Sequence, residues 1–349
     1  MSSIDLARQL VDQDASGPED LREFPFISII VPTYNRARTL PFLFSALARQ
    51  LYPATALELI VVDNSSSDDT ESVVGDWARS LPFPVSFYRK DNKGPAASRN
   101  YGAARARGDI LAFTDSDCIP VPLWLRNAAR AVELGAGIVC GPFLPIARTE
   151  DRVLSAQQPA VTYDRGCYPT ANLFVKRKAF LAVGGFDEKF GLYPWGEMVA
   201  GEDTDLAWRV RRTGEQAIFR EDAIVCHLAT PIKLTHFLLR PIVVQIIPRL
   251  LPKIPELRRM YLWKRYFLSP VHLYFYLALL GVTLALITHQ WLSCLLALPW
   301  LYHHGHFAAV CIRWEGVRGI TRALLLVYNQ VACSLVLMLA SIRYRRIVL

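Results

Sequence analysis

A run of 42 residues without Asp, Glu, Lys or Arg, from 271 to 312, most constrains what this chain can fold into. A membrane-spanning helix needs about 20 apolar residues, so the run is long enough for two crossings. Residues 323–342 supply another uncharged segment. We therefore expect two or three hydrophobic segments, at about 271–290, 291–312 and 323–342, within a transmembrane region at 270–349.

Charge is divided unevenly along the chain. Residues 1–229 carry 25 Lys and Arg against 29 Asp and Glu, whereas residues 230–349 carry 14 against 2. The net charge of +8 is therefore concentrated beside the apolar segments, where basic side chains commonly contact anionic headgroups. We expect membrane lipids as a partner. Nucleic acid is not expected, because the globular part is net acidic.

Residues 230–269 combine aliphatic and basic side chains with several prolines. This composition suits short amphipathic helices in the membrane interface. The basic clusters at 258–265, 313–322 and 343–346 would all prefer the cytoplasm, which three crossings cannot deliver. One segment is therefore a candidate for a re-entrant or interfacial position.

The N-terminal 22 residues form a polar, acidic leader without an apolar core, which argues against a secretory signal or a transit peptide. We expect the N-terminal part to stay in the cytoplasm. The seven cysteines form no C-x-x-C pair, so neither a zinc module nor a disulfide framework is indicated. We interpret them as small buried side chains in a reducing compartment.

Short apolar runs alternate with helical patterns between the leader and residue 229. Residues 26–31 (FISIIV) and 57–62 (LELIVV) are typical of buried strands, and each leads into a polar cluster. A further strand at 110–113 leads into the sequence TDSDC. The alternation predicts an α/β fold with a mainly parallel sheet, in which ligands bind at the carboxyl ends of the strands.

The aspartates of TDSDC, Asp115 and Asp117, suit a divalent cation. Hard cations take carboxylate oxygens and can bridge to a diphosphate. Aspartates also cap turns, so the D-x-D spacing alone leaves a structural role open. The succession of several polar strand-end features along one chain favours a binding site.

Five motifs in order resemble the inverting glycosyltransferases of family 2, with the GT-A type nucleotide-sugar fold. They are ISIIVPTYNRARTL, LELIVVDNSSSDDT, NKGPAASRNYGAARARGDILAFTDSDC, VGGFDEKF and GEDTDLAWRVRRTG. The resemblance covers about residues 26–229 and implies a Rossmann-like, mixed sheet in a catalytic domain at 23–229. It also implies a nucleotide diphosphate sugar as donor and Mg or Mn as cofactor. C-terminal membrane helices are an appendage that many bacterial members carry.

The resemblance implies donor-binding positions residue by residue. Asp63 would accept hydrogen bonds from the base, and Tyr34 would stack in the first loop unless it is an ordinary loop aromatic. Gly94 and Arg99 match the segment that approaches the donor, although Arg99 could instead pair with a carboxylate. Asn172 matches a polar position near the sugar. The implied donor-binding residues are Pro32, Thr33, Tyr34, Asn35, Arg36, Asp63, Gly94, Arg99, Asp115, Ser116 and Asn172.

The same resemblance implies a metal site and a catalytic base. Asp117 and Asp115 match the metal motif, and His227 is a candidate third ligand, although a lone histidine on an apolar strand is more often a core group. Asp203 matches the base that takes the proton of an acceptor hydroxyl as it attacks the anomeric carbon, with inversion. The neighbouring Glu202 is interpreted as a charge at a helix N-terminus.

Two further groups have alternative interpretations. The GGFD sequence at 184–187 resembles a loop that closes on the acceptor side, with a plain turn as the alternative. The histidines at 303, 304 and 306 have no carboxylate or cysteine at ligand spacing, so we interpret them as a polar patch rather than a metal site.

The implied activity is transfer of a sugar to a hydroxyl of a lipid-linked, glycan or other membrane-proximal acceptor, at the cytoplasmic face of a bacterial inner membrane. A polyprenyl-phosphate sugar transferase is the alternative, but an ionised phosphate needs no base, and G-E-D at 201–203 favours a hydroxyl. A processive synthase is disfavoured because Q-x-x-R-W is absent. A non-catalytic scaffold would be expected to lose Asp117 or Asp203, and both are present.

Overall fold

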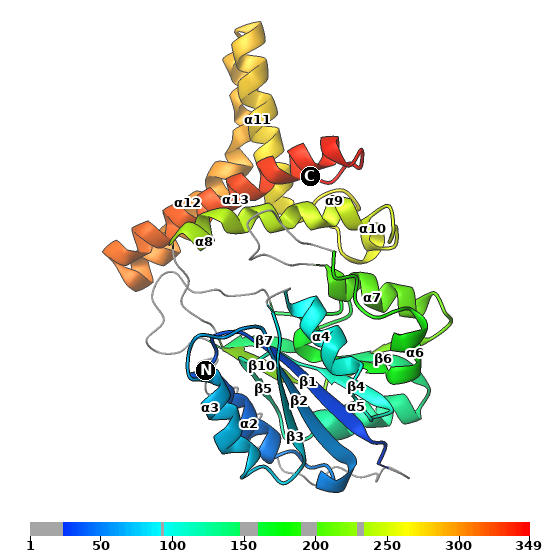
Figure 1. The fold of residues 1–349 in the computed structure, drawn as a ribbon. Coiled ribbons are helices and arrows are strands. Elements are labelled where there is room, and N and C mark those ends of the chain that lie inside the picture. The colour runs from blue at the N-terminus through cyan, green and yellow to red at the C-terminus, as the bar shows by residue number, and fades with distance from the viewer. Residues whose placement is uncertain (1–23, 92–93, 147–159, 190–200, 229–233) are drawn as a thin grey trace. The chain divides into compact units, whose positions relative to one another are not determined.

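The protein is described by a computed structural model (Figure 1). The described residues are 24–91, 94–146, 160–189, 201–228 and 234–349. The chain divides into two compact units. The first comprises residues 1–150 and 157–230, and the second comprises residues 151–156 and 231–349. The expected leader lies outside the described residues.

The first unit alternates strands and helices, as the hydrophobic pattern predicts. Its strands are β1 (Ile27–Thr33), β2 (Leu57–Asp63), β3 (Val85–Arg89), β4 (Ile110–Phe113), β5 (Cys118–Pro120), β6 (Ala136–Cys140), β7 (Phe143–Ile146), β8 (Leu173–Lys176), β9 (Gln216–Phe219) and β10 (Val225–Leu228). Its helices are α2 (Leu40–Ala48), α3 (Thr70–Ala78), α4 (Pro95–Ala103), α5 (Trp124–Glu133), α6 (Arg177–Ala182) and α7 (Glu202–Arg211), with 3-10 turns η1 (Ala54–Ala56) and η2 (Thr170–Asn172).

The main sheet has seven strands in the order β3-β2-β1-β4-β8-β6-β9. β1 runs parallel to β2 and β4, and β2 runs parallel to β3, whereas β8 is antiparallel to both of its neighbours. A second sheet has the order β5-β10-β7. The predicted mixed, mainly parallel sheet with flanking helices is therefore confirmed, and the ends of β1, β2 and β4 lie at one edge.

The central strands are mainly apolar, and the buried polar side chains in them can pair, as where Ser28 Oγ donates to Glu58 Oε1 at 2.6 Å. Every residue of β2 is buried, and β1 is buried except at Pro32. Helix α2 covers them with Leu40, Leu43, Phe44 and Leu47, whose spacing places all four on one helical face.

Helix α4 approaches the sheet closely because Gly102 has no side chain. A Cβ at this position would lie 2.7 Å from Ile30 Cγ2 and 3.3 Å from Val62 Cγ2. A larger residue would force the helix away from β1 and β2. Gly102 therefore determines how close α4 lies to β1 and β2, and with it where the other side chains of α4 are placed.

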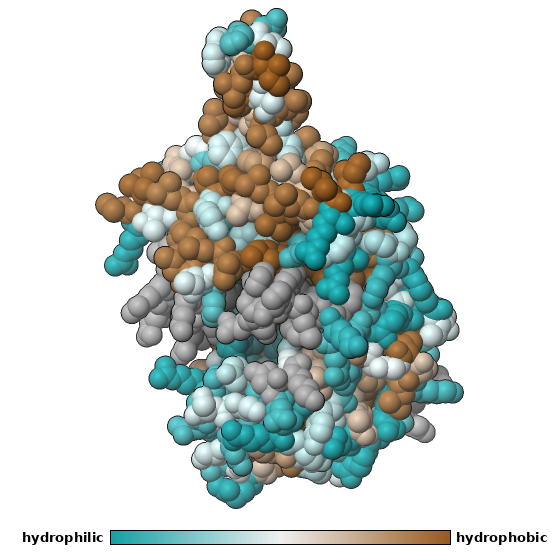
Figure 2. Space-filling model, turned by 45° about the horizontal axis from the view of Figure 1, so that its top comes forward, coloured by the Kyte–Doolittle hydropathy of each residue, from teal (hydrophilic) through white to brown (hydrophobic). Residues whose placement is uncertain are grey.

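The second unit is helical. Its elements are α8 (Leu234–Leu239), η3 (Arg240–Gln245), α9 (Ile246–Leu250), α10 (Leu257–Met260), α11 (Pro270–Thr288), η4 (Trp291–Ala297), α12 (Leu298–Glu315) and α13 (Val317–Arg343). In the described part of the chain, α11 and α13 are long and apolar enough to cross a membrane by length and composition. The segment expected at 291–312 is split between η4 and α12 instead of forming one long apolar helix. Apolar atoms dominate the surface of these helices (Figure 2).

Asn172 ties three elements of the first unit together from a fully buried position. Its Nδ2 donates to the carbonyl oxygens of Pro142, at 2.9 Å, and Ala223, at 2.7 Å, and its Oδ1 accepts from Trp124 Nε1 at 2.8 Å. Both amide hydrogens are therefore used within the core. This side chain has no hydrogen left to offer the sugar that the resemblance placed beside it.

We expect Asn172→Ala to destabilise the protein without a specific loss of ligand binding. The substitution leaves a buried indole N–H and two carbonyls unpaired, which costs about 3 kcal/mol, or roughly 6 to 10 °C in Tm. Thermal unfolding of the purified chain measures the shift. Asn127→Ala, which removes a bond to the Asp222 carbonyl at an exposed site, is the matched control with little effect. Equal melting temperatures for the two variants would contradict the assignment.

Candidate active site

A buried arginine joins the charged residues at the edge of the sheet. Arg99 on α4 is only 4% exposed. Its Nη2 donates to Asp115 Oδ1 at 2.8 Å, and its Nη1 donates to Glu202 Oε1 at 3.2 Å. Burial lowers the pKa of Arg99, but the charges of Asp115 and Glu202 outweigh this and raise it. One guanidinium thus holds the loop after β4 and the start of α7 together. The sequence allowed Arg99 to contact the donor or to pair with a carboxylate, and in the structure it pairs with carboxylates.

Asp117 belongs to a second ion-pair group in the same loop. Its Oδ1 lies 3.0 Å from His227 Nε2 on β10, and its Oδ2 lies 3.5 Å from Arg36 Nη2 in the loop after β1. Burial raises the pKa of Asp117, but the bond to His227 and the charge of Arg36 bring it below its usual value. Burial lowers the pKa of His227, but the bond to Asp117 raises it overall. Each of the two groups therefore favours the charged form of the other.

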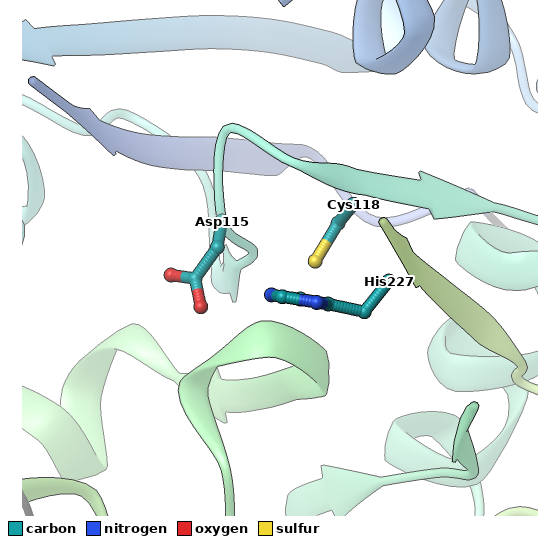
Figure 3. Close-up of side chains that lie close together, drawn as sticks. All are labelled: Asp115, Cys118 and His227. Atoms are coloured by element: carbon teal, nitrogen blue, oxygen red, sulfur yellow. The ribbon is translucent and has the colours of Figure 1, made fainter. Parts of the chain in front are cut away.

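Asp115, Cys118 and His227 converge closely enough to hold a metal ion (Figure 3). One possible ligand atom from each lies within 4.8 Å of the others. Cys118 was not anticipated from the sequence, although it directly follows the D-x-D motif. Burial and the charges of Asp115 and Asp117 hold the pKa of the Cys118 thiol well above its usual range, so the thiol stays protonated.

The chemistry of the donor set decides which cation would fit. Mg and Mn prefer carboxylate oxygens, and Mn also accepts imidazole, whereas a protonated thiol is a poor ligand for either. Asp117 bonds to His227 and belongs to the same loop as Asp115. By donor chemistry alone, the carboxylates and the imidazole suit a hard divalent cation better than the Cys118 thiol does, and of these groups Asp115 and His227 belong to the cluster whose ligand atoms lie within 4.8 Å of one another.

The Glu202–Asp203 pair begins helix α7. Gly201 takes a left-handed conformation before it, with φ of 90°, which a side chain would strain. Glu202 is buried, and its Oε2 has no hydrogen-bond partner among the described residues. The Asp203 Oδ1 accepts the backbone N–H of Thr204 at 2.6 Å. Glu202 is the first residue of α7, as expected for a charge at a helix N-terminus, and its carboxyl is buried against Arg99.

Burial controls the ionisation of this pair. Desolvation and the adjacent charge of Asp203 raise the pKa of Glu202 to about 7. Desolvation also raises the pKa of Asp203, against the opposing effects of the Thr204 N–H and Arg99. A carboxylate whose pKa is raised toward neutrality is a stronger base than an exposed aspartate.

Asp63 is fully buried at the end of β2 and is already engaged within its own loop. Its carboxylate accepts the backbone N–H and the hydroxyl of Ser66, and its Oδ2 lies 3.7 Å from Arg89 Nε. Thr33 is its partner across the sheet, and the Thr33 Oγ1 has no hydrogen-bond partner among the described residues. A nucleobase at Asp63 would have to share the carboxylate with these groups.

Asn35 links the loop after β1 to the loop after β2. Its φ is 52°, a conformation that asparagine tolerates better than most residues. The Asn35 Oδ1 accepts the Ser67 N–H at 2.8 Å, and the Asn35 N–H donates to Ser66 Oγ at 2.8 Å. Tyr34, the residue before Asn35, is 49% exposed.

The remaining candidate residues occupy different settings in the first unit. Gly94 has a φ of 85° at the entry to α4, and Ser116 is buried between the two aspartates. Asn172 lies in the core, as described above. In the GGFD loop, Asn100 bonds to both backbone groups of Phe186, at 2.9 Å each, so α4 holds that turn as well.

Residues 28–186 match the family described as Glycosyl transferase family 2. Over these residues the chain is similar to glycosyltransferases of family 2. It is 29% identical over 215 residues to Glycosyltransferase AglE of Haloferax volcanii, an alignment that covers 59% of this chain and 68% of the relative. It is 30% identical over 246 residues to a pre-mycofactocin glycosyltransferase of Mycobacterium tuberculosis, covering 64% of this chain and 48% of that one. The chain thus spans about half of the mycobacterial relative.

Two solved structures share the fold. A mannosyltransferase from Pyrobaculum calidifontis, in complex with GDP-Man and Mn2+, matches with a TM-score of 0.58 and 20% identity over 94% of this chain and 92% of its own. Residues 1–349 of TarS from S. aureus, in complex with UDP-GlcNAc, match with a TM-score of 0.51 and 15% identity over 92% of each chain. Both support the GT-A fold of the first unit.

We expect the acidic limb of kcat/KM near pH 7, because burial and the charge of Asp203 raise the pKa of Glu202 to about 7 and the two adjacent carboxyls titrate together. Glu202→Gln removes the charge beside Asp203 and is expected to move this limb to lower pH by about one unit. The measurement is nucleotide release from the donor between pH 5 and 9. Glu71→Gln, at an exposed site on α3, should leave the limb in place. A limb unmoved by Glu202→Gln would show that the two carboxyls do not titrate together.

Proposed function

We propose that this chain moves one sugar from a nucleotide diphosphate sugar to a hydroxyl of a lipid-linked or membrane-proximal glycan acceptor, with inversion. The observation that carries the proposal is the buried Arg99, which pairs with Asp115 of the D-x-D motif and with Glu202 of the E-D pair. A donor-binding motif and a candidate base are thereby fixed at one sheet edge, as a single displacement requires.

The donor class is supported by the fold and by the charged groups at the strand ends. The two structural neighbours are described with GDP-Man and UDP-GlcNAc, both of which are nucleotide diphosphate sugars. Asp115, Asp117 and His227 would hold a Mg or Mn ion, which when bound neutralises charge developing on the leaving diphosphate. Arg36, 3.5 Å from Asp117, is positioned to add a second positive charge there.

The acceptor step is assigned to Asp203. Its carboxylate takes the hydroxyl proton while the acceptor oxygen forms a bond to the anomeric carbon and the bond to the diphosphate breaks. The raised pKa of Asp203 supports this role, because a hydroxyl gives up its proton more readily to a stronger base. Arg99 keeps the adjacent Glu202 in place and acts as a positioning residue.

The membrane location is part of the proposal. Two long apolar helices and the basic residues of 230–269 support an acceptor at a membrane surface. We assign the chain to a bacterial inner membrane, with a catalytic domain at 23–229 in the cytoplasm, interface helices at 230–269 and a membrane region at 270–349.

We expect purified protein in detergent to bind one of the UDP, GDP, dTDP or CMP sugars in the presence of Mn2+, as measured by calorimetry. Asp117→Ala should weaken this binding by about 10- to 100-fold, because it removes a carboxylate that holds the cation. Asp76→Ala, at an exposed site on α3, is the matched control and should bind as the parent does. Unaltered metal-dependent binding by Asp117→Ala would exclude Asp117 as a ligand.

We expect Asp203→Asn to bind donor normally and to lose transfer by about 100-fold or more, because the proton acceptor is gone. Nucleotide release in the presence of membranes from the source organism measures transfer. Normal release by Asp203→Asn with donor bound would rule out a general base at this position and favour a phosphate acceptor, which needs none.

A further inference from the structure

Helix α11 and the 3-10 segment η4 form a tight hairpin in the second unit. The Ser293 Oγ donates to the Gly281 carbonyl at 2.9 Å, and a Cβ on Gly281 would lie only 2.4 Å from the Ser293 carbonyl oxygen. Figure 1 shows α11 rising away from α13, which runs across its base. The hairpin is therefore a projection from the other helices of this unit.

Both ends of the hairpin return to the same side chain on α13. Gln330 Nε2 donates to the Val271 carbonyl at 3.4 Å, and Gln330 Oε1 accepts from Trp300 Nε1 at 2.9 Å. Tyr276, in the second turn of α11, donates its hydroxyl proton to the Ser334 carbonyl at 2.6 Å. Residues 271 and 300 therefore both lie beside Gln330, and the chain between them forms the outgoing and returning legs of the hairpin.

The lengths of the two legs argue against a pair of complete crossings. Helix α11 has 19 residues and is about 28 Å long, slightly less than the roughly 30 Å of a bilayer core. The return from Trp291 to Trp300 takes ten residues, mostly 3-10, and covers about 19 Å. The chain is back at the base before a second crossing could be complete.

The two legs of the hairpin are apolar, and its tip is the short polar sequence Thr288, His289 and Gln290. No Asp, Glu, Lys or Arg occurs between 271 and 312, and the side chains around the turn are highly exposed. Leu286 is 62% exposed, Ile287 71% and Leu292 80%. Figure 2 shows the projecting part of the molecule in the hydrophobic colour over much of its surface. Such a surface requires an apolar environment.

Helix α13 carries a matching stripe along its length. Exposed apolar residues recur at a spacing of three, four or seven, which places them on one helical face, whereas the opposite face packs against η3 and α9. The exposed residues of this stripe include Val317, Ile320, Leu324, Tyr328, Leu335, Leu339 and Ile342. A one-sided stripe is what a helix lying along a membrane surface presents.

Basic side chains from two distant segments gather beside the hairpin base. Arg258 Nη1 donates to the Ile347 carbonyl at 3.0 Å, and the Leu349 N–H donates to the Tyr266 carbonyl at 2.7 Å. The basic cluster at 258–265 is thereby brought to the one at 343–346. Their charge complements anionic headgroups.

We propose that α11 and η4 form a re-entrant hairpin that enters and leaves an anionic bilayer from one face, while α12 and α13 lie along that face. All three basic clusters then share one side of the membrane, which three crossings cannot achieve. The proposal rests on the membrane association in the proposed function and not on the transfer reaction, so a failed donor assay leaves it intact.

The test is labelling of single introduced cysteines by a membrane-impermeant maleimide, using the full chain in sealed vesicles of phosphatidylcholine and phosphatidylglycerol. The sites are Gln290→Cys at the hairpin tip, Arg318→Cys after the α12–α13 turn, and Arg346→Cys near the C-terminus. Glu71→Cys, on exposed α3, marks the face of the catalytic unit, and the parent protein gives the background from native cysteines.

We expect Arg318→Cys and Arg346→Cys to be labelled from the same face as Glu71→Cys, and Gln290→Cys to be labelled only after detergent is added. Labelling of Arg318→Cys from the opposite face would make α11 and α13 true spans and overturn the proposal. Labelling of Arg346→Cys or Gln290→Cys from the opposite face would overturn it as well. Each outcome is read without any enzyme activity.

A second measurement needs no cysteine and perturbs the fold little. Fluorescence quenching by lipids brominated along the acyl chain is compared between the parent and Trp291→Phe, and the difference reports the tip alone. We expect more quenching from bromines deep in the chain than from bromines near the headgroup. Release of the protein from vesicles by alkaline carbonate, as a dimer, would show that a second copy covers the hairpin and would overturn the proposal.

Discussion

The double ion pair of Arg99 is the interaction on which the arrangement of the active-site edge depends. Two carboxyl groups of different loops, Asp115 and Glu202, share one guanidinium that is almost fully buried. Buried charges are costly unless they are paired, and removing one partner of such a pair typically costs about 3 to 5 kcal/mol. The loop after β4 and the start of α7 therefore have one low-energy arrangement, in which the D-x-D motif and the E-D pair face each other.

The parallel strands supply the frame for that interaction. Because β1, β2 and β4 are neighbours in register, Thr33 lies beside Asp63, and the loop after β4 begins next to both. Asn35 then fastens the first two loops to each other. The edge of the sheet is thus held by hydrogen bonds and ion pairs before any ligand arrives, which lowers the entropic cost of binding one.

The sequence was sufficient for the sheet because the strands are short, mainly apolar runs, such as 57–62, that end in polar clusters. The sequence also offers Asp115, Asp117 and Asp203 as candidate site residues, since their motifs are local. Side-chain partners were harder to predict. Whether Arg99 pairs with a phosphate or a carboxylate depends on where α7 lies, which no local pattern encodes.

Three further features escaped the sequence for related reasons. Asn172 is polar, and only the tertiary structure shows that its amide is used up by Trp124 and two carbonyls. Cys118 joins the metal-sized cluster only because β10 pairs with β5. By composition, the uncharged run after 271 predicts two membrane spans. Hydropathy gives no indication of the close contact at Gly281 that folds the run into a short hairpin.

The close approach of α4 to the sheet has a consequence for how variants of this chain would be interpreted. Gly102 bears no chemistry, yet it lies one turn from Arg99 and sets how deeply that arginine reaches. An added methyl group would lift the helix against Ile30 and Val62 and draw the guanidinium away from its two carboxylates. In a mutational scan, substitutions of this glycine would therefore be as damaging as those of the charged residues of the site. The cause would be the displacement of Arg99 and not a lost contact with a substrate.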